Sequence, residues 1–386
     1  MKKCKLSEIF NLQMGKTPAR NNLEYWENGT NPWISIADMT TNGRFIKRTK
    51  ENITDRAVYE TGIKPIYPET VIMSFKLSVG KVAQATAKAY SNEAIMAFEI
   101  KSSESSEYSI DNNYAYYLLS ALSFENVGNK AVMGKTLNKS ILEDTVVYIH
   151  KWDEQRKIIS KLDKVNDLIE IRKQQLSKLD ELVKSRFIEL FGDYDLSHIQ
   201  SEWKTISEIG KVVGGATPKT NIEEYWDGEY RWITPAELDT DSGYIYDSVR
   251  KLTKAGIESC SLQEIPINTV ILSSRAPIGK VAITGNTFYC NQGFKNIICD
   301  KDVLPRYLYT VLLLNTDYLN SLGRGATFKE ISKSIVENIK IPVPPIDLQN
   351  QFATFVEQTD KLKFEVKQSL EQLETLKKSL MQQYFG

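Results

Sequence analysis

Two loops with related sequences carry the side chains best suited to hydrogen bonding with a polar or charged partner. The first, SFKLSVGK (74–81), supplies hydroxyl and ammonium groups, and the second, SSRAPIGK (273–280), adds the guanidinium of Arg275. Such groups bind phosphate oxygens, and Arg, Lys, Asn and Gln also bind base edges in the major groove of DNA. Arg275 is the best candidate for a bidentate contact with guanine. The ordinary alternative for each residue is a solvated charged loop.

Polar residues in other loops complete the candidate DNA-binding set. Thr17 and Thr217 each precede a proline, so they could instead set the geometry of a turn. Glu93 stands where the second loop set has Gln292, and a carboxylate there would need a cytosine amino group or some distance from phosphate. The candidates are Lys16, Thr17, Ser74, Lys76, Ser78, Lys81, Asn92, Lys135, Thr136, Thr217, Lys219, Ser273, Ser274, Arg275, Lys280, Asn291, Gln292, Arg324, Thr327 and Lys329.

No pattern of residues indicates catalysis or metal binding. Asn31-Pro32-Trp33 lacks the second proline of an adenine methyltransferase tetrapeptide. Gly15-Lys16-Thr17 lacks the earlier glycine of a phosphate-binding loop. The four cysteines contain no Cys-x-x-Cys pair and are separated in sequence from the two histidines. We expect reduced cysteines, no metal site and no enzymatic activity in this chain.

The 386 residues have the composition of a soluble globular protein of two or three domains, with 41% hydrophobic and 25% charged residues. The 49 basic and 49 acidic side chains give no net charge, so a DNA contact must come from local patches. No apolar run approaches the ~20 residues of a membrane helix, and the start lacks the pattern of a signal peptide. We expect a cytoplasmic location.

The sequence repeats itself along its whole length. GKTPARNNLEYW (15–26) is answered by GATPKTNIEEYW (215–226), and TVIMSFKLSVGKVA (70–83) by TVILSSRAPIGKVA (269–282). Short β-branched and aromatic runs between Gly, Pro, Asn and Asp predict strands and turns in each copy, with brief helices at 114–122 and 307–314. Each copy is therefore expected to be a mixed α+β domain.

Each copy ends in a long amphipathic segment without internal Gly or Pro. Apolar residues recur at three- and four-residue steps, which is typical of helices with coiled-coil-like seams. A helix of 35 to 40 residues is ~50 to 60 Å long, so the two helices are expected to pack on each other, antiparallel; the alternative is that each folds back on its own domain. The predicted seam consists of Leu162, Val165, Ile169, Leu176, Leu179, Val183, Leu362, Val366, Leu373, Leu376 and Leu380.

The predicted fold class is α+β, with a pseudo-two-fold internal repeat. Two similar mixed α/β domains, at 1–150 and 193–346, are separated by two long antiparallel coiled-coil-like helices, at 151–192 and 347–386. The second helix follows the rigid lead IPVPPIDLQ (341–349), whereas the first follows VYIHKWDEQ (147–155). The glutamine is shared but the prolines are not, so the orientation of the first domain on its helix is predicted less firmly than that of the second.

These features together resemble the DNA-specificity subunit of type I restriction-modification systems. The resemblance rests on GKTPARNNLEYWENGTNPWI (15–34), GGATPKTNIEEYWDGEYRWI (214–233), the repeated Gly-Lys-Val-Ala, the segment GRGATFKEISKSIVENIKIPVPPIDLQNQ (323–351) and the paired helices. It implies two target-recognition domains, each reading one half of an interrupted, asymmetric double-stranded DNA site. The helices would set the spacer and dock methylation subunits.

The same resemblance implies that catalysis belongs to partner subunits. S-adenosylmethionine, ATP and Mg²⁺ are expected there and not in this chain. The partners would be two methylation subunits and, where the system has them, restriction subunits. Two other classes remain open from the sequence: a coiled-coil scaffold or adaptor that binds proteins, and a self-sufficient DNA methyltransferase, which would need the missing cofactor motifs.

Overall fold

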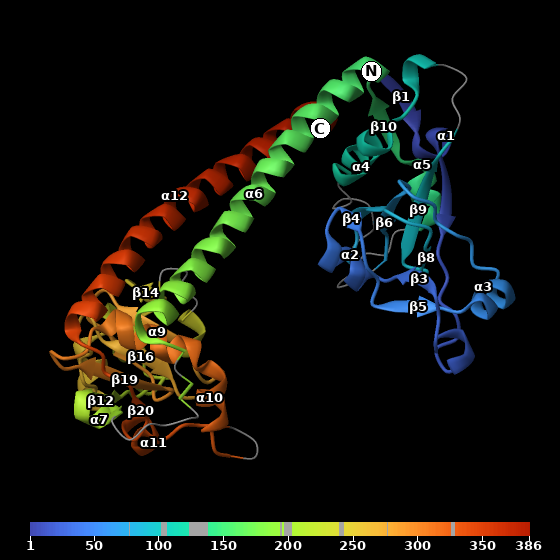
Figure 1. Cartoon of the computed structure of the whole chain (residues 1–386). Helices are drawn as coiled ribbons and strands as arrows, with labels where there is room; N and C mark the ends of the chain where they lie inside the picture. The colour runs from blue at the N-terminus through green and yellow to red at the C-terminus, as the bar shows by residue number, and fades with distance from the viewer. Residues whose placement is uncertain are drawn as a thin grey trace. The chain divides into compact units, whose positions relative to one another are not determined.

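The computed structural model describes residues 1–76, 78–101, 106–122, 138–193, 195–196, 203–238, 243–275, 277–325 and 329–386. The first globular domain precedes a long helix (Figure 1). Its elements are β1 Lys2–Lys5, α1 Leu6–Ile9, β2 Phe10–Met14, η1 Leu23–Tyr25, β3 Asn31–Ile34, α2 Ile36–Asn42, β4 Phe45–Ile46, β5 Glu51–Ile53, α3 Asp55–Thr61, β6 Val71–Ser74, β7 Val82–Ala85, β8 Tyr90–Ser91, β9 Ile95–Ile100, η2 Ser106–Tyr108, α4 Asn112–Ser120, α5 Lys139–Asp144 and β10 Val146–Ile149.

In chain order, the second globular domain follows the long helix α6 Trp152–Phe191 and precedes the long helix α12 Ile346–Phe385. Its elements are β11 Lys204–Thr205, α7 Ile206–Ile209, β12 Gly210–Gly214, η3 Glu223–Tyr225, β13 Trp226–Ile233, η4 Pro235–Glu237, β14 Tyr244–Ile245, β15 Arg250–Leu252, α8 Lys254–Ser259, β16 Val270–Ser273, β17 Val281–Thr284, β18 Tyr289–Cys290, β19 Phe294–Cys299, α9 Pro305–Leu314, α10 Thr316–Ser321, α11 Lys333–Glu337 and β20 Lys340–Ile341.

The two domains have the same sheet topology, which confirms the predicted repeat of mixed α/β domains. A five-stranded sheet has the order β2-β9-β6-β7-β4 in the first domain and β12-β19-β16-β17-β14 in the second. A three-stranded sheet has the order β5-β3-β8 or β15-β13-β18, and a two-stranded ribbon pairs β1 with β10 or β11 with β20. The parallel pairs are repeated as well: β4 with β7 and β3 with β8 in the first domain, and β14 with β17 and β13 with β18 in the second.

Buried apolar side chains join each five-stranded sheet to a covering helix. In the first domain, Phe10 and Phe98 meet edge to face across β2 and β9, beneath the buried Tyr114 and Leu118 of α4. In the second, Tyr307 of α9 is fully buried in the equivalent core. Figure 1 shows α9 against the sheet that contains β16 and β19.

One fully buried glutamine near the start of each long helix fastens that helix to the preceding domain. The Gln155 amide nitrogen donates to the carbonyls of Ser109 (2.8 Å) and His150 (2.9 Å), and its oxygen accepts from the Asp111 N–H (3.2 Å). Gln349 repeats this pattern with two carbonyls and one N–H of the second domain. The first helix is therefore held by the same bonds as the second, although it lacks the proline-rich lead.

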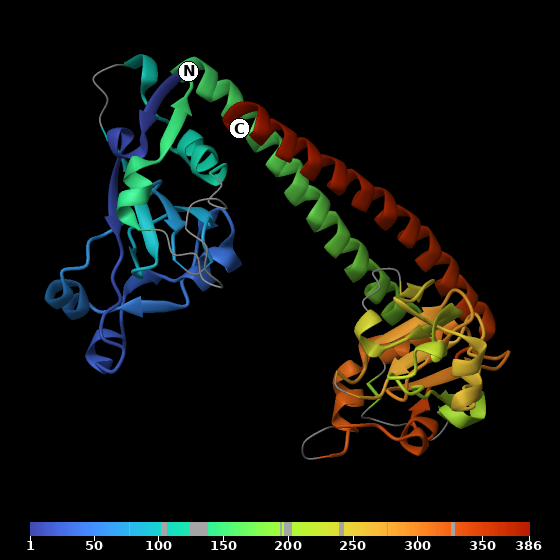
Figure 2. The ribbon, with the colours of Figure 1, turned by 180° about the vertical axis from the view of Figure 1, so that it is seen from behind.

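The chain divides into two compact units, residues 1–173 with 369–386 and residues 174–368. In the first unit, the end of α12, including Leu380 and Phe385, packs on the core that holds Leu162 of α6. In the second unit, Phe187 near the end of α6 meets Phe352 near the start of α12, with ring centroids 5.4 Å apart. The helices therefore pair in antiparallel fashion within each unit, as predicted, and both views show them side by side (Figures 1 and 2).

The seam of this pair begins at the two glutamines and follows alternating three- and four-residue steps. Leu162, Val165 and Ile169 are buried along it, and the partly buried members are Leu176, Leu179, Val183, Val366, Leu373 and Leu380. Leu362 and Leu376 were predicted to belong to it, but they are 52% and 46% exposed.

Lys363 and Lys377 occupy the seam in place of these two leucines. Alternating steps of three and four residues from Gln349 arrive at Lys363 and Lys377. The buried glutamine fixes which residues of α12 lie in the seam, whether or not a more apolar side chain is their neighbour. A lysine can lie there because its aliphatic stem packs while its amine leaves the apolar layer, as Lys363 does in pairing with Asp180. The two predicted seam positions are corrected accordingly.

Replacing Gln349 by Leu is expected to lower the free energy of unfolding by about 2–4 kcal/mol, because one N–H and two carbonyls would remain buried without partners. Gln155→Leu should have the same effect on the first unit. Urea or thermal unfolding of the full chain measures both variants. Gln358→Leu, at an exposed position of α12, is the matched control and should change stability by less than about 0.5 kcal/mol. Equal effects of Gln349→Leu and the control would contradict the role of the glutamine.

Candidate nucleic-acid interface

The repeated Gly-x-Thr-Pro turn crosses closely over the loop that follows β8 or β18. A side chain on Gly15 would come within 2.2 Å of the Asn92 carbonyl oxygen, and one on Gly215 within 2.2 Å of the Cys290 carbonyl oxygen. Only glycine permits this approach. The indole N–H of the buried Trp33 donates to the Lys16 carbonyl at 3.1 Å, and Trp232 makes the equivalent bond at 3.1 Å. The tryptophans thus hold the turn from inside.

A guanidinium lies over a pair of edge-to-face tryptophans in both domains, but it comes from different places in the sequence. In the first domain, Arg20 lies 3.9 Å from the ring centre of Trp26 and pairs with Glu51. In the second domain, Arg250 lies 3.4 Å from the ring centre of Trp226. Arg250 occupies the position that Glu51 has in the first domain. Both domains therefore place a cation on the tryptophans, but in the second domain it comes from the strand that supplies the carboxylate in the first.

The turn threonines are bonded to the polar residues that follow β8 and β18. Thr17 donates to the Glu93 carboxylate, and Thr217 donates to the Gln292 side-chain oxygen at 2.6 Å. The hydrogen bond from Thr17, followed by the charges of Lys76 and Arg20, lowers the pKa of Glu93. The first domain therefore presents a carboxylate beside these cations where the second presents a neutral amide.

Asn92 and Asn291 contribute to the shape of their own loops. The Asn92 side-chain oxygen accepts from the N–H of Ala94 at 3.0 Å, and that of Asn291 accepts from Gly293 at 2.9 Å. Within the residues that the structure describes, neither amide nitrogen has a hydrogen-bond partner, so each is able to donate to a ligand. Both residues are half-buried. Within its own domain, Asn92 lies beside the turn of Thr17, and Asn291 lies beside the turn of Thr217, so the structure places each predicted asparagine next to a predicted threonine.

Three of the predicted hydroxyl contacts lie inside the protein. Ser74 and Ser273 are fully buried, and each hydroxyl donates to a carbonyl across its turn, to Ser78 or Pro277, while it accepts the N–H of Lys81 or Lys280. Ser274 is also fully buried and accepts from Lys295. Their physical role is to shape the loop, so the prediction that these three hydroxyl groups contact DNA is corrected.

Arg275 belongs to an ion-pair cluster that joins two loops of the second domain. Its Nε lies 3.0 Å from the Glu330 carboxylate, which also lies 3.5 Å from the amine of Lys295. Lys295 is 8% exposed, and burial lowers its pKa, while the charge of Glu330 partly offsets that shift. The backbones of Arg324 and Glu330 are bonded in both directions at 3.0 Å. Arg275 is therefore held in place by Glu330, while about half of its side chain stays exposed.

The remaining candidates divide by exposure. Lys16 donates to the Thr61 carbonyl at 2.6 Å, and Lys81 donates to Thr40, so both ammonium groups already have protein partners. The exposed candidates are Lys16, Ser78, Thr217, Lys219, Arg275, Gln292, Arg324 and Lys329. The half-buried ones are Thr17, Lys76, Lys81, Asn92, Lys280 and Asn291. Lys135, Thr136 and Thr327 lie outside the described residues.

Four charged residues of these sites were not selected from the sequence. Each of them contacts residues that are far away in the chain, and nothing in the neighbouring sequence indicates a functional role. They are Arg20, Arg250, Lys295 and Glu330. One signal was present for Arg20, because it falls within the repeated string 15–26 that also contains Trp26.

Across the described parts of the chain, no three His, Cys, Asp or Glu side chains are grouped to hold a metal ion. Within the same residues, no helix combines the length and hydropathy needed to cross a membrane.

Known proteins match the two copies of the repeat separately. Residues 1–181 and 200–375 match the family model described as "Type I restriction modification DNA specificity domain". The MjaIX specificity subunit of Methanocaldococcus jannaschii is 39% identical over 210 residues, which are 53% of this chain and 48% of that subunit. The EcoR124I/EcoR124II specificity subunit of Escherichia coli is 30% identical over 173 residues, 42% of this chain and 41% of that one. The chain thus spans about half the length of these curated relatives.

Solved structures share the fold at low sequence identity. The type I restriction-modification S subunit from M. genitalium superimposes with a TM-score of 0.58 at 16% identity, covering 100% of this chain and 96% of that one. A chain from a structure of type I restriction-modification complex assembly gives a TM-score of 0.62 at 15% identity, covering 99% and 96%. This likeness establishes the fold of the whole chain.

Glu330→Gln is expected to lower the free energy of unfolding by about 1–3 kcal/mol at pH 7, because Lys295 would lose the carboxylate that stabilises its buried charge. The pKa of Lys295 in the folded chain is already below its unfolded value, and the substitution lowers it further. The loss should therefore shrink as pH rises toward the unfolded lysine value, where the amine is neutral in both states. Urea unfolding at pH 7 and pH 10 measures it.

The control is Glu258→Gln, which removes an exposed ion pair with Lys254 in the same domain. A loss of stability by Glu330→Gln that is equal at both pH values would contradict the stabilisation of the Lys295 charge by Glu330, because the pair with Arg275 does not titrate in this range.

Proposed function

Because the chain belongs to the type I restriction modification DNA specificity family, we propose that it selects the DNA sequence on which a methylating complex acts. Each globular domain reads one half of an interrupted double-stranded site, and the chain itself catalyses no step. The observation that carries this proposal is a duplicated domain with one topology and two different sets of loop side chains. S-adenosylmethionine, ATP and Mg²⁺ are then held by partner subunits.

The difference between the loops supports an asymmetric site. Lys76 in the first domain corresponds to Arg275 in the second, and Glu93 corresponds to Gln292. An arginine and a glutamine can each form two hydrogen bonds with a purine, whereas a glutamate accepts from a cytosine amino group. Two domains with the same frame and these different groups would select different half-sites.

The helices offer matched apolar positions for partner subunits. Leu168 and Leu376 are exposed in the first unit, and both lie between the contact of Arg172 with Ser369 and that of Lys161 with Tyr384. They are therefore at about the same level of the antiparallel pair.

The second unit carries its own exposed leucine pair, Leu182 and Leu362. Counted from the buried glutamines, Leu168 corresponds to Leu362 and Leu182 to Leu376. We assign these leucines to the docking of methylation subunits, one on each unit, because the same pair recurs with the repeat and exposed leucines gain from burial.

Exchange of residues 193–346 for the equivalent domain of another specificity subunit is expected to change one half of the methylated sequence and leave the other half unchanged. The readout is a genome-wide map of methylated adenine in cells that express the chain with its methylation subunits. A map with both halves changed would contradict independent reading. Absence of methylation that depends on the chain would instead favour a protein-binding scaffold.

Leu168→Asp with Leu376→Asp is expected to weaken binding of the methylation subunit to the first unit by at least about tenfold, because each substitution places a charge in an apolar contact. Leu182→Asp with Leu362→Asp tests the second unit. Co-purification and mass photometry should then report a complex that has lost one methylation subunit. Glu365→Gln, an exposed change on α12, is the control. Full assembly of both double variants would exclude the leucines as the docking sites.

A further inference from the structure

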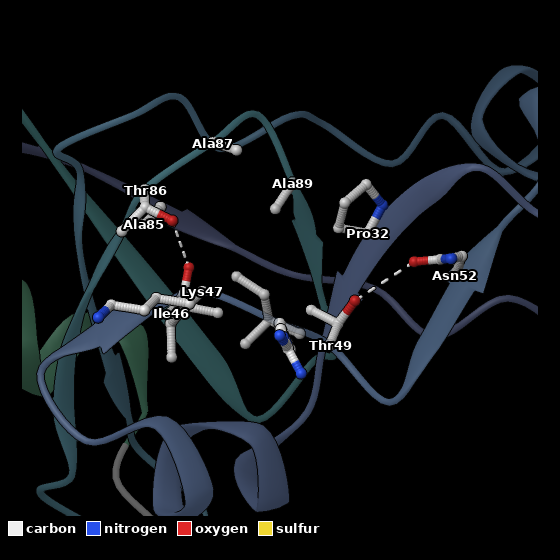
Figure 3. Close-up of a pocket in the computed structure, with 11 residues that line it drawn as sticks. Pro32, Ile46, Lys47, Thr49, Asn52, Ala85, Thr86, Ala87 and Ala89 are labelled. Carbon is white, nitrogen blue, oxygen red and sulfur yellow. Dashed lines mark hydrogen bonds between the residues drawn. The ribbon is translucent and has the colours of Figure 1, made fainter.

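A hollow on the first domain combines a small apolar floor with a charged rim. Its volume is about 290 Å³. Ile34, Ile46 and Ala89 are buried beneath it, and Figure 3 shows Ala85, Ala87 and Ala89 along one side. Because the alanine side chains end at Cβ, the floor leaves room for a flat ring of about the size that small-ligand pockets accommodate.

Two cations stand at the rim on a backbone turn that is fixed in place. Lys47 and Arg48 are exposed, and neither side chain makes an ion pair within the described part of the chain. The Asn42 side-chain oxygen accepts both of their backbone N–H groups, at 3.0 and 3.1 Å, and its amide nitrogen donates to the Arg48 carbonyl at 2.9 Å. The turn is thus ordered before any ligand arrives, while the two charges remain available.

A polar pair lies on the side of the hollow near β5. The Thr49 hydroxyl lies 3.3 Å from the Asn52 side-chain oxygen, as the dashed line in Figure 3 shows. An asparagine amide can donate two hydrogen bonds and its oxygen can accept two, which suits the edge of a nucleobase. Thr86 is committed elsewhere, because its hydroxyl donates to the Ile46 carbonyl.

The second domain has lost this combination at the equivalent positions. Phe288, which is fully buried, replaces Ala89, and Asp247 replaces Arg48. Asp247 pairs with Arg231 at 3.2 Å and lies 3.9 Å from Lys251, so both cations near this position already face a carboxylate. Free cations over an alanine floor are therefore a property of the first domain and not of the repeated frame.

We propose that this hollow binds a nucleobase that carries a phosphate. The flat base lies on the alanine and isoleucine floor, Asn52 bonds its edge, and Lys47 with Arg48 bind the phosphate. A free nucleotide and an unpaired nucleotide of a DNA strand share this chemistry. The site goes beyond the proposed function, since reading of a paired half-site needs no pocket for a single base.

The test uses the full-length chain and titrates AMP, adenosine, ribose 5-phosphate and a single-stranded DNA 10-mer by calorimetry. Both variants carry the residue that the second domain has at the same position, Arg48→Asp and Ala89→Phe. AMP is expected to bind more tightly than adenosine or ribose 5-phosphate, and each variant should weaken AMP binding by at least about tenfold. Lys301→Asp, an exposed charge reversal in the second domain, should leave binding unchanged.

Binding of the 10-mer that AMP displaces, and that both variants weaken, would identify DNA strands as a second source of the same ligand. Binding of the 10-mer alone, lost in both variants, would support an unpaired DNA nucleotide as the occupant. No binding of AMP or the 10-mer, or binding that Arg48→Asp leaves unchanged, would overturn the proposal. Arg48→Asp changes an exposed side chain, so it remains informative if Ala89→Phe unfolds. None of these outcomes depends on the methylation map, which tests the proposed function separately.

Discussion

A single buried amide near the start of each long helix fixes the relation between helix and domain. The chain must turn from a two-stranded ribbon into a helix there, and the turn leaves backbone groups away from water. Gln155 and Gln349 each satisfy two carbonyls and one N–H. Since an unpaired buried group is costly, the glutamine can occupy only one place, and the seam of each helix is counted from it. That register decides which helix residues face the domain, the other helix or the solvent.

The two domains share the same kinds of contact even where the residues that make them lie at different positions of the repeat. A guanidinium joins each domain to its long helix, but in the first domain it is Arg44, just before β4, that pairs with Asp163, whereas in the second it is Arg306 of α9 that pairs with Asp360. The position equivalent to Arg44 is Gly243, where a side chain would come within 2.7 Å of Tyr309. Arg20 and Arg250 have changed places in the same way beside the tryptophans. In each of these cases a guanidinium lies against aromatic rings, although it comes from a different position in the sequence.

Loops on this frame can diverge because the fold does not depend on their exposed groups. The buried serines of the turns after β6 and β16 make the same bonds in both domains, while the neighbouring cation changes from the half-buried Lys76 to the exposed Arg275. The same freedom gives the first domain a hollow with two cations at its rim, whereas a carboxylate faces the cations at the equivalent position of the second domain. The proposed reading of DNA would need this separation, since base choice must vary while each domain keeps its geometry.

The sequence by itself determined the repeat, the mixed α/β character of both domains, the two long helices and their antiparallel pairing. These features follow from periodicity, turn residues and length, which are local properties summed over many positions. Tertiary structure decided which serines are buried, that Glu330 binds both Arg275 and Lys295, and that Lys363 and Lys377, not Leu362 and Leu376, occupy the seam. Those outcomes depend on contacts between residues far apart in the chain. The pattern along one segment contains no information about the partner that another segment brings to it.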